Sequence, residues 1–400
     1  MSDSARLKDL IASVLILILP VIPAFGQLNP GGLIDFEIRK GGADSSPLLN
    51  QTPNDKLNIF TPTIRIFGSA GLSDRWFLEV ALQSDYYEGD SLSPVFFSAV
   101  NLNWFLKENS DLMLTIGRFF TPYGRYSRLI LSSDNPFVNL PLSHSWYLPA
   151  DPVRGYYEGM LDYDKVSGQS MIYQRMYSQG LMLSNSAAGN RFRFELAATL
   201  SPASGRTDLG NHNRISVTGR AEASPAIWAD MGISFSYGPY MRRSELNSAL
   251  SERQFREFSQ TMAGADLSFS YLYYMLALDL NYSRWTAPYI TDAGVVENDD
   301  LILPVWHAGA ELHGRFSFLP GAYAALRYEI LRPSELRSTT YAPPGQNPDW
   351  ATEVNRVEIV AGYRIERNII LKLSYQTSAL PGAAWEIDDD VVAFQISALF

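Results

Sequence analysis

The sequence predicts an all-β protein, a transmembrane antiparallel β-barrel of about 16 strands with a long third outer loop folded into its lumen. Segments of about ten residues alternate between apolar and polar side chains along most of the chain, and this period of two is typical of β-strands. The connections between these segments alternate between short and long. Mean hydropathy is only -0.08, although aromatic residues reach 13%. Such a composition suits a sheet with one face toward lipid and the other toward water.

The first 26 residues are expected to be a signal peptide, so the barrel is assigned to residues 27–400. Arg6 and Lys8 precede a short apolar run at residues 11–21. Ala24 and Gly26 put small residues at the two positions that a signal peptidase reads, which predicts cleavage before Gln27. A retained anchor helix is the alternative, although the run is short for a membrane span.

The first five predicted strands each have one apolar face and one polar face. In the first strand, Asp35, Glu37 and Arg39 lie opposite apolar even-numbered residues. The other four strands repeat this alternation with Trp, Phe, Val, Ile and Leu on the apolar side, as expected for a pleated sheet. These strands are predicted at residues 33–40, 57–70, 76–86, 95–105 and 112–119.

Eleven more strands come after a long break in the alternation. The last strand is the clearest, because every even-numbered residue from Val392 to Phe400 is apolar. Its ten residues are about the length that a tilted strand needs to cross a bilayer. An edge strand of a soluble protein is the alternative for this segment alone. The eleven strands are predicted at residues 178–184, 191–199, 214–223, 228–240, 258–270, 272–285, 304–318, 323–331, 352–366, 369–376 and 391–400.

The lengths of the connections alternate in a way that a soluble sandwich has no reason to show. Short connections lie at residues 71–74, 107–110, 186–190, 224–227, 271, 319–321 and 367–368. Long polar connections lie at residues 41–56, 86–94, 120–177, 200–213, 241–257, 286–303, 332–351 and 377–390. Outer-membrane barrels combine an even strand number with short periplasmic turns and long outer loops. If both termini lie in the periplasm, every long connection faces outward.

Aromatic residues recur near the predicted strand ends, as they do in the interfacial girdles of barrels. The residues concerned are Trp76, Trp104, Trp228, Trp285, Trp306 and Phe400. The terminal strand resembles the C-terminal signal of bacterial outer-membrane barrels, in which a final Phe addresses the chain to the assembly machinery. This resemblance implies that Phe400 is an assembly signal.

The face opposite the predicted lipid face is expected to line a water-filled lumen. Sixteen strands leave a lumen too wide for side chains to fill, and charges that line water tune ion selectivity. The alternative is that most of these charges only solvate the wall and pair with neighbours. The predicted lumen wall comprises Arg65, Glu79, Arg193, Glu195, Arg220, Glu311, Arg315, Arg327, Arg356, Glu358, Arg364 and Lys372.

The connection at residues 120–177 is unusually long and apolar for an exposed loop. Loops of this length without a function are uncommon, and we expect this one to fold into the lumen and narrow the pore. An external cap or added strands are the alternatives, with residues 155–164 as a candidate strand. The predicted constriction comprises Arg118, Arg125, Arg128, Arg154, Glu158 and Asp162.

A resemblance to a known family rests on residues 117–124, Gly-Arg-Phe-Phe-Thr-Pro-Tyr-Gly. This stretch is similar to a Gly-x-Phe-x-x-Pro-Phe-Gly motif of porins related to the phosphate-selective porins O and P. Residues 179–184 and the strand at residues 191–200 are similar to the segments that come after this motif in those porins. The resemblance implies a 16-stranded channel for small anions or other hydrophilic solutes. Porins of this size are often homotrimers.

Other classes of function find little support in the sequence. The net charge of -10 argues against a nucleic-acid partner, and the absence of cysteine excludes thiolate sites. An outer-membrane enzyme would need a nucleophile or base near the outer rim, and the chain has only four histidines, His144, His212, His307 and His313. His307 and His313 lie on one strand about 20 Å apart. We therefore expect no enzyme, no cofactor and no metal.

The leading hypothesis is a passive porin of the bacterial outer membrane. Its expected partners are outer-membrane lipid, the barrel-assembly machinery and small hydrophilic solutes or ions, anions among them. A structural or partner-binding barrel in a secretion, uptake or electron-transfer complex is the alternative, because a lumen filled by a partner would give the same sequence pattern.

Overall fold

The fold was analysed in a computed structural model. The structure describes residues 28–45, 57–60, 63–84, 95–107, 111–156, 168–187, 191–205, 215–291, 293–339, 350–381 and 388–400. The predicted signal peptide at residues 1–26 lies outside these ranges. No helix within them is long and apolar enough to cross a membrane.

The described strands form one antiparallel sheet of nineteen strands. Three of them, β2 (Leu57–Phe60), β7 (Ala150–Asp151) and β8 (Gly155–Tyr156), are short additions. The other sixteen build the wall: β1 (Leu28–Gly41), β3 (Ile64–Ser73), β4 (Trp76–Ser84), β5 (Phe96–Phe105), β6 (Met113–Phe120), β9 (Tyr177–Ala187), β10 (Phe192–Thr199), β11 (Ser216–Ala226), β12 (Ala229–Pro239), β13 (Ser259–Tyr271), β14 (Tyr274–Ile290), β15 (Val296–Arg315), β16 (Ala322–Pro333), β17 (Val354–Glu366), β18 (Ile369–Ala379) and β19 (Val391–Leu399). The predicted strand number is confirmed.

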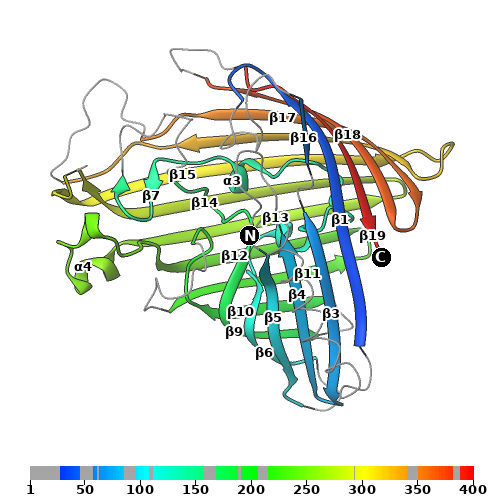
Figure 1. The fold of residues 1–400 in the computed structure, drawn as a ribbon, viewed down its shortest axis with the longest axis horizontal. Helices are drawn as coiled ribbons and strands as arrows, with labels where there is room; N and C mark the ends of the chain where they lie inside the picture. Colours follow the sequence, from blue (N-terminus) through cyan, green and yellow to red (C-terminus); the bar gives the residue numbers. More distant parts are fainter. Residues whose placement is uncertain are drawn as a thin grey trace, which may run out of the picture.

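The sheet closes on itself, because its first strand pairs with its last. Residues 33–41 of β1 lie opposite residues 391–399 of β19, while residues 28–34 pair with β3. In Figure 1, β3 to β5 run steeply across the view and β12 to β15 run almost horizontally, so two walls of the barrel cross in projection. Closure leaves every wall strand with two neighbours, which is what a lipid environment requires of a sheet.

The wall is inside-out relative to a soluble protein, since its outer face is apolar and its inner face carries the polar and charged side chains. On β17, the Ile359 side chain is 52% exposed on the outer face, while its neighbour Glu358 is 0% exposed on the inner face. The same contrast holds on β1 between Phe36, which is exposed, and Glu37, which is buried. This alternation results directly from the period of two in the sequence, since consecutive side chains point to opposite faces.

The C-terminal residue completes the closure. The Phe400 amide donates to the Gly32 carbonyl at 2.9 Å, and the Gly32 amide donates to the Phe400 carbonyl at 2.7 Å. The Phe400 ring lies over Gly32, where a Cβ atom would come within 2.3 Å of it. The ring remains 72% exposed, so it is available to an outside partner.

The predicted outer connection at residues 286–303 is largely wrong. β14 continues to Ile290 and β15 begins at Val296, so most of this stretch is strand. Trp285 is also not a girdle residue. Its odd number places it on the inner face, where it is fully buried against Trp350, with the ring centroids 5.8 Å apart.

An apolar cluster fills the inner face at the ends of these long strands. It contains Trp285, Ile290, Leu303 and Trp350, together with residues from the connections after β6, β12 and β16. β14 and β15 have 17 and 20 residues, more than the roughly 9–11 that span a bilayer. The strands therefore extend beyond the length needed for the membrane, and the cluster covers this extension.

Replacing Trp350 with alanine is expected to lower the free energy of unfolding by about 3–5 kcal/mol, because a large buried side chain is lost. Trp350→Phe keeps one six-membered aromatic ring but loses the pyrrole part of the indole and its hydrogen bond to the Pro304 carbonyl at 2.7 Å, which predicts a smaller loss of about 1–3 kcal/mol. Urea unfolding of the refolded protein measures both. Equal losses for the two variants would contradict the packing argument.

Candidate channel interior

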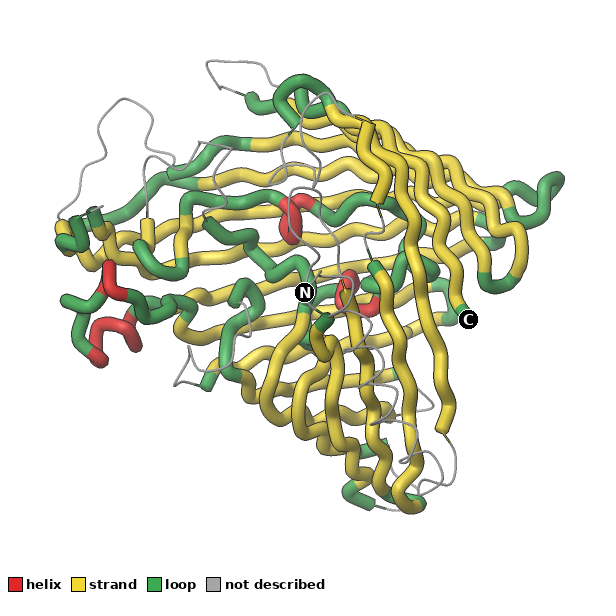
Figure 2. The backbone as a smooth tube through the Cα atoms, in the orientation of Figure 1, coloured by secondary structure: helices red, strands yellow, loops and turns green. Residues whose placement is uncertain are grey.

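The segment between β6 and β9 lies against the inner face of the wall. Figure 2 shows its short helices, η2 (Arg125–Arg128) and α3 (Leu142–Ser145), among the strands, whereas α4 (Glu252–Glu257) lies at the ends of the long strands. The residues described here are 121–156 and 168–176. We refer to residues 121–156 as the inner segment.

Glu358 is the main anchor of the inner segment. Its carboxylate accepts hydrogen bonds from the backbone amides of Val138 and Asn139 at 3.2 and 3.1 Å and from the Asn139 side chain at 3.1 Å. It also pairs with Arg327 and accepts a bond from the Ser374 hydroxyl at 2.7 Å. A buried carboxylate is tolerated only when it is paired and hydrogen-bonded in this way.

Three further wall residues hold the same segment. Glu329 accepts a bond from the Leu142 amide at 2.9 Å. Lys372 donates to the Ser132 carbonyl at 2.6 Å, and Arg356 donates to the Ser145 hydroxyl at 2.9 Å. The anchors therefore come from β16, β17 and β18, and they explain why these wall charges are buried.

His144 is buried where α3 meets the wall. Its ring lies 4.8 Å from the Tyr126 ring, centroid to centroid, and its Nδ1 atom is 3.0 Å from the Ser143 hydroxyl. Burial, followed by the nearby charge of His307, lowers the pKa of His144 to about 3. His144 is therefore neutral at pH 7, with no role as a charged pore residue.

Acidification is expected to weaken the docking of the inner segment between pH 6.5 and about 3. In this range an undocked His144, with an ordinary pKa near 6.5, takes up a proton that the docked residue does not. Protons therefore favour the undocked form, and stability falls as the pH falls. The measurement is protease cleavage of the segment as a function of pH, compared between the wild type and His144→Gln. Identical pH profiles would contradict this role, because other acid-sensitive groups are common to both proteins.

The predicted constriction residues do not form one ring. Arg125 pairs with Glu311, and Arg128 pairs with Glu222 and, at 3.5 Å, with Glu195. These two arginines share η2 but reach different parts of the wall. Their charges are compensated by carboxylates, which the sequence alone does not indicate.

The other predicted constriction residues lie elsewhere. The Arg118 guanidinium lies 5.8 and 5.4 Å from the ring centroids of Phe96 and Tyr177. Arg154 lies between β7 and β8, and β8 pairs with Tyr289 near the end of β14, so it is remote from η2. Glu158 and Asp162 lie outside the described residues, as does most of the candidate strand at residues 155–164, of which only β8 is described.

All twelve predicted wall residues lie on the inner face, and they fall into three groups. The first is covered by the inner segment. The second lies on β10 and β11, where Glu195 also lines a cavity. The third lies on other strands and lines cavities. The covered group is Glu311, Arg327, Arg356, Glu358 and Lys372; the second is Arg193, Glu195 and Arg220; the third is Arg65, Glu79, Arg315 and Arg364.

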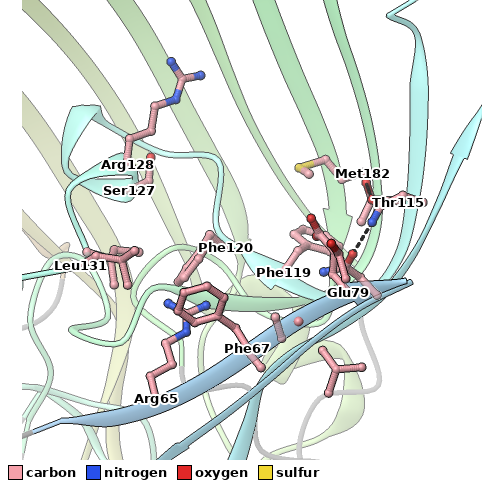
Figure 3. Close-up of a pocket in the computed structure, with 18 of the residues that line it drawn as sticks. Arg65, Phe67, Glu79, Thr115, Phe119, Phe120, Ser127, Arg128, Leu131 and Met182 are labelled. Atoms are coloured by element: carbon pink, nitrogen blue, oxygen red, sulfur yellow. Dashed lines mark hydrogen bonds between the residues drawn. The ribbon is translucent and has the colours of Figure 1, made fainter. Parts of the chain in front are cut away.

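A cavity of about 800 Å³ separates the inner segment from β3 to β6, and we call it the mixed cavity. In Figure 3, Arg128 stands on the inner segment, across the cavity from Glu79. Arg65 lies against Phe120, with its guanidinium carbon 4.8 Å from the ring centroid. Charges of both signs and several apolar side chains therefore share this space.

A second cavity of about 600 Å³ lies on the other side of the inner segment, and we call it the inner-mouth cavity. Arg125, Arg315, Arg364 and His313 contribute to its lining, and Asp134 lines both cavities. In the described part of the chain, no group of three or more potential ligands could hold a metal ion.

Sequence reasoning missed the inner-segment partners of the wall. Glu358 accepts from the backbone amides of Val138 and Asn139, and Lys372 donates to the backbone carbonyl of Ser132. Nothing in a sequence marks which peptide groups of a loop meet a buried charge. The only available signal was the excess of buried-type residues, such as Phe137 and Trp146, in a loop.

Comparison with solved structures shows a porin-like barrel fold. OmpF of Salmonella typhi in complex with daunomycin matches with a TM-score of 0.58 at 12% identity, over 93% of this chain and 97% of its own. An anion-selective porin from Comamonas acidovorans matches with a TM-score of 0.57 at 8% identity, over 94% and 99%. The trimer form of OmpT, an outer membrane protein of Vibrio cholerae, gives a TM-score of 0.52 at 9% identity, over 94% and 99%. No protein-family model and no curated protein matches the sequence.

Proposed function

We propose that this protein is a passive channel of the bacterial outer membrane for small hydrophilic solutes or ions. The main observation in support of this proposal is the inside-out barrel, which has charged cavities on both sides of the inner segment. An apolar outer face suits lipid, and accessible charges on the inner face suit water-filled space. The similarity to solved porins in fold supports the same function.

The proposal includes export by the signal peptide at residues 1–26 and insertion by the assembly machinery. The exposed ring of Phe400 supports the second step, because a recognition residue must be accessible. The trimer form of OmpT from Vibrio cholerae supports a homotrimer for this chain. The proposed activity needs no cofactor and no catalytic residue.

The inner segment is proposed to narrow the lumen, with Arg125 and Arg128 at its narrow part. Because both arginines are paired with carboxylates, a strong anion preference is not expected from them. The motif at residues 117–124 still supports a relation to the phosphate-selective group, which remains a prediction of the sequence.

Planar-bilayer recording of the refolded protein tests the proposed function. Stepwise current increases on addition of protein, each of similar size, are expected for a passive channel. A correctly folded barrel that inserts without carrying current would refute the proposal. Folding is checked independently by the electrophoretic mobility of heated and unheated samples.

A further inference from the structure

The inner-mouth cavity carries an excess of positive charge. Among its described lining residues are three arginines, Arg125, Arg315 and Arg364, and one carboxylate, Asp134. His313 adds a ring nitrogen, Nε2, that is buried without a hydrogen-bond partner among the described residues. The mixed cavity, in contrast, combines Arg65 and Arg128 with Glu79, Glu195 and Asp134.

The three arginines of this cavity differ in their partners. Arg125 is compensated by Glu311. Among the described residues, Arg364 donates to two backbone carbonyls, those of Ser133 at 3.1 Å and Arg367 at 2.9 Å, and to no carboxylate. Arg315 has no carboxylate partner within the described ranges. Both Arg315 and Arg364 are exposed, so their charge is available to a solute.

The fold places these two arginines together at one end of the barrel. Arg315 ends β15, and Arg364 lies near the end of β17, where its amide donates to the Gly321 carbonyl at 2.9 Å. Gly321 has a φ of +90° in the short turn between β15 and β16, a conformation that favours glycine. The Tyr323 hydroxyl donates to the Pro136 carbonyl at 3.2 Å and fixes the inner segment beside the cavity.

We propose that the inner-mouth cavity is a binding site for small oxyanions, with Arg315 and Arg364 as its principal donors. A guanidinium group presents a planar fork of N–H donors that matches a carboxylate or phosphate. Two forks without carboxylate partners among the described residues, in a cavity of about 600 Å³, can hold a solute of that class. This inference rests on the proposed function, because it assigns the anion selectivity of the same channel to a site at the short-turn end.

The first test is the reversal potential in a potassium chloride gradient, measured for Arg315→Gln, Arg364→Gln and the double variant. Each substitution is expected to lower the chloride-to-potassium permeability ratio about tenfold. One unit charge acting across about 6 Å of water changes the permeability of each ion by a factor of about three, in opposite directions for chloride and potassium. Arg193→Gln is the matched control. Arg193 faces the lumen from β10, outside the lining of this cavity, and has no carboxylate partner in the described chain.

The control separates a site from a general effect of lumen charge. A shift for Arg193→Gln equal to those of the two site variants would overturn the proposal, because the anion preference would then depend on total charge. An unchanged ratio in the double variant would also overturn it. In either case the channel would still conduct, and the proposed function would stand.

The second test uses inorganic pyrophosphate and does not need conduction. Calorimetric titration of the refolded barrel is expected to show binding that falls at least tenfold in the double variant and is retained in Arg193→Gln. In bilayers, pyrophosphate added at the short-turn side is expected to block chloride current at lower concentration than when added at the other side. Binding without any current would uphold the site and refute the channel, and equal binding by wild type and double variant would overturn the site.

Discussion

Replacing Glu358 with alanine is expected to release the inner segment from the barrel wall. The substitution removes the acceptor of two backbone amides, the Asn139 side chain and the Ser374 hydroxyl, and it leaves Arg327 without its closest carboxylate. Removing one partner of a buried pair typically costs about 3–5 kcal/mol. We therefore expect a larger and noisier single-channel conductance and faster protease cleavage between residues 132 and 145.

Two control variants sharpen this prediction. Glu79→Ala also removes an inner-face carboxylate, but Glu79 makes no ion pair or hydrogen bond within the described chain, so the inner segment should stay docked. Glu358→Gln keeps an acceptor oxygen for the backbone amides and loses the charge, and an intermediate effect is expected. Cleavage as slow in Glu358→Ala as in Glu79→Ala would show that the segment is held by other contacts.

An arginine introduced at Ile359 is expected to block stable insertion. Ile359 lies near the middle of β17 on the exposed outer face. An arginine at the bilayer midplane of a barrel costs about 2–4 kcal/mol, whereas the cost near an interface is about 0–1 kcal/mol. Ile365→Arg is the matched control, since Ile365 lies on the same face of the same strand near its short-turn end.

The measurement is urea-dependent unfolding from lipid vesicles, with folded fraction followed by electrophoretic mobility. The diagnostic result is a loss of stability that depends on depth in the bilayer, because arginine at either exposed position would have a similar effect on a soluble barrel. Equal losses of stability for Ile359→Arg and Ile365→Arg would contradict the assignment of this face to lipid.

The strand pattern of this barrel could be predicted from the sequence because it depends on local order. A period of two assigns Glu358 and Ile359 to opposite faces without any knowledge of their neighbours, and the parity of connection lengths gives an antiparallel sheet of sixteen strands. The same reasoning placed all twelve predicted wall residues on the inner face. This reasoning failed for the connection at residues 286–303, where β14 and β15 extend past the membrane. The ends of these two strands are set by the apolar cluster that covers them and not by the edge of the lipid.

The partners of the charged residues were decided only by the tertiary structure. Arg125 and Arg315 look alike in the sequence, yet Arg125 is paired with Glu311, which is 186 residues away, and Arg315 faces a cavity. Glu358 binds peptide groups of the inner segment that carry no sequence signal. Strand alternation is a local property of the backbone. The compensation of a charge, in contrast, depends on groups that are distant in the sequence and come within a few ångströms only when the barrel closes.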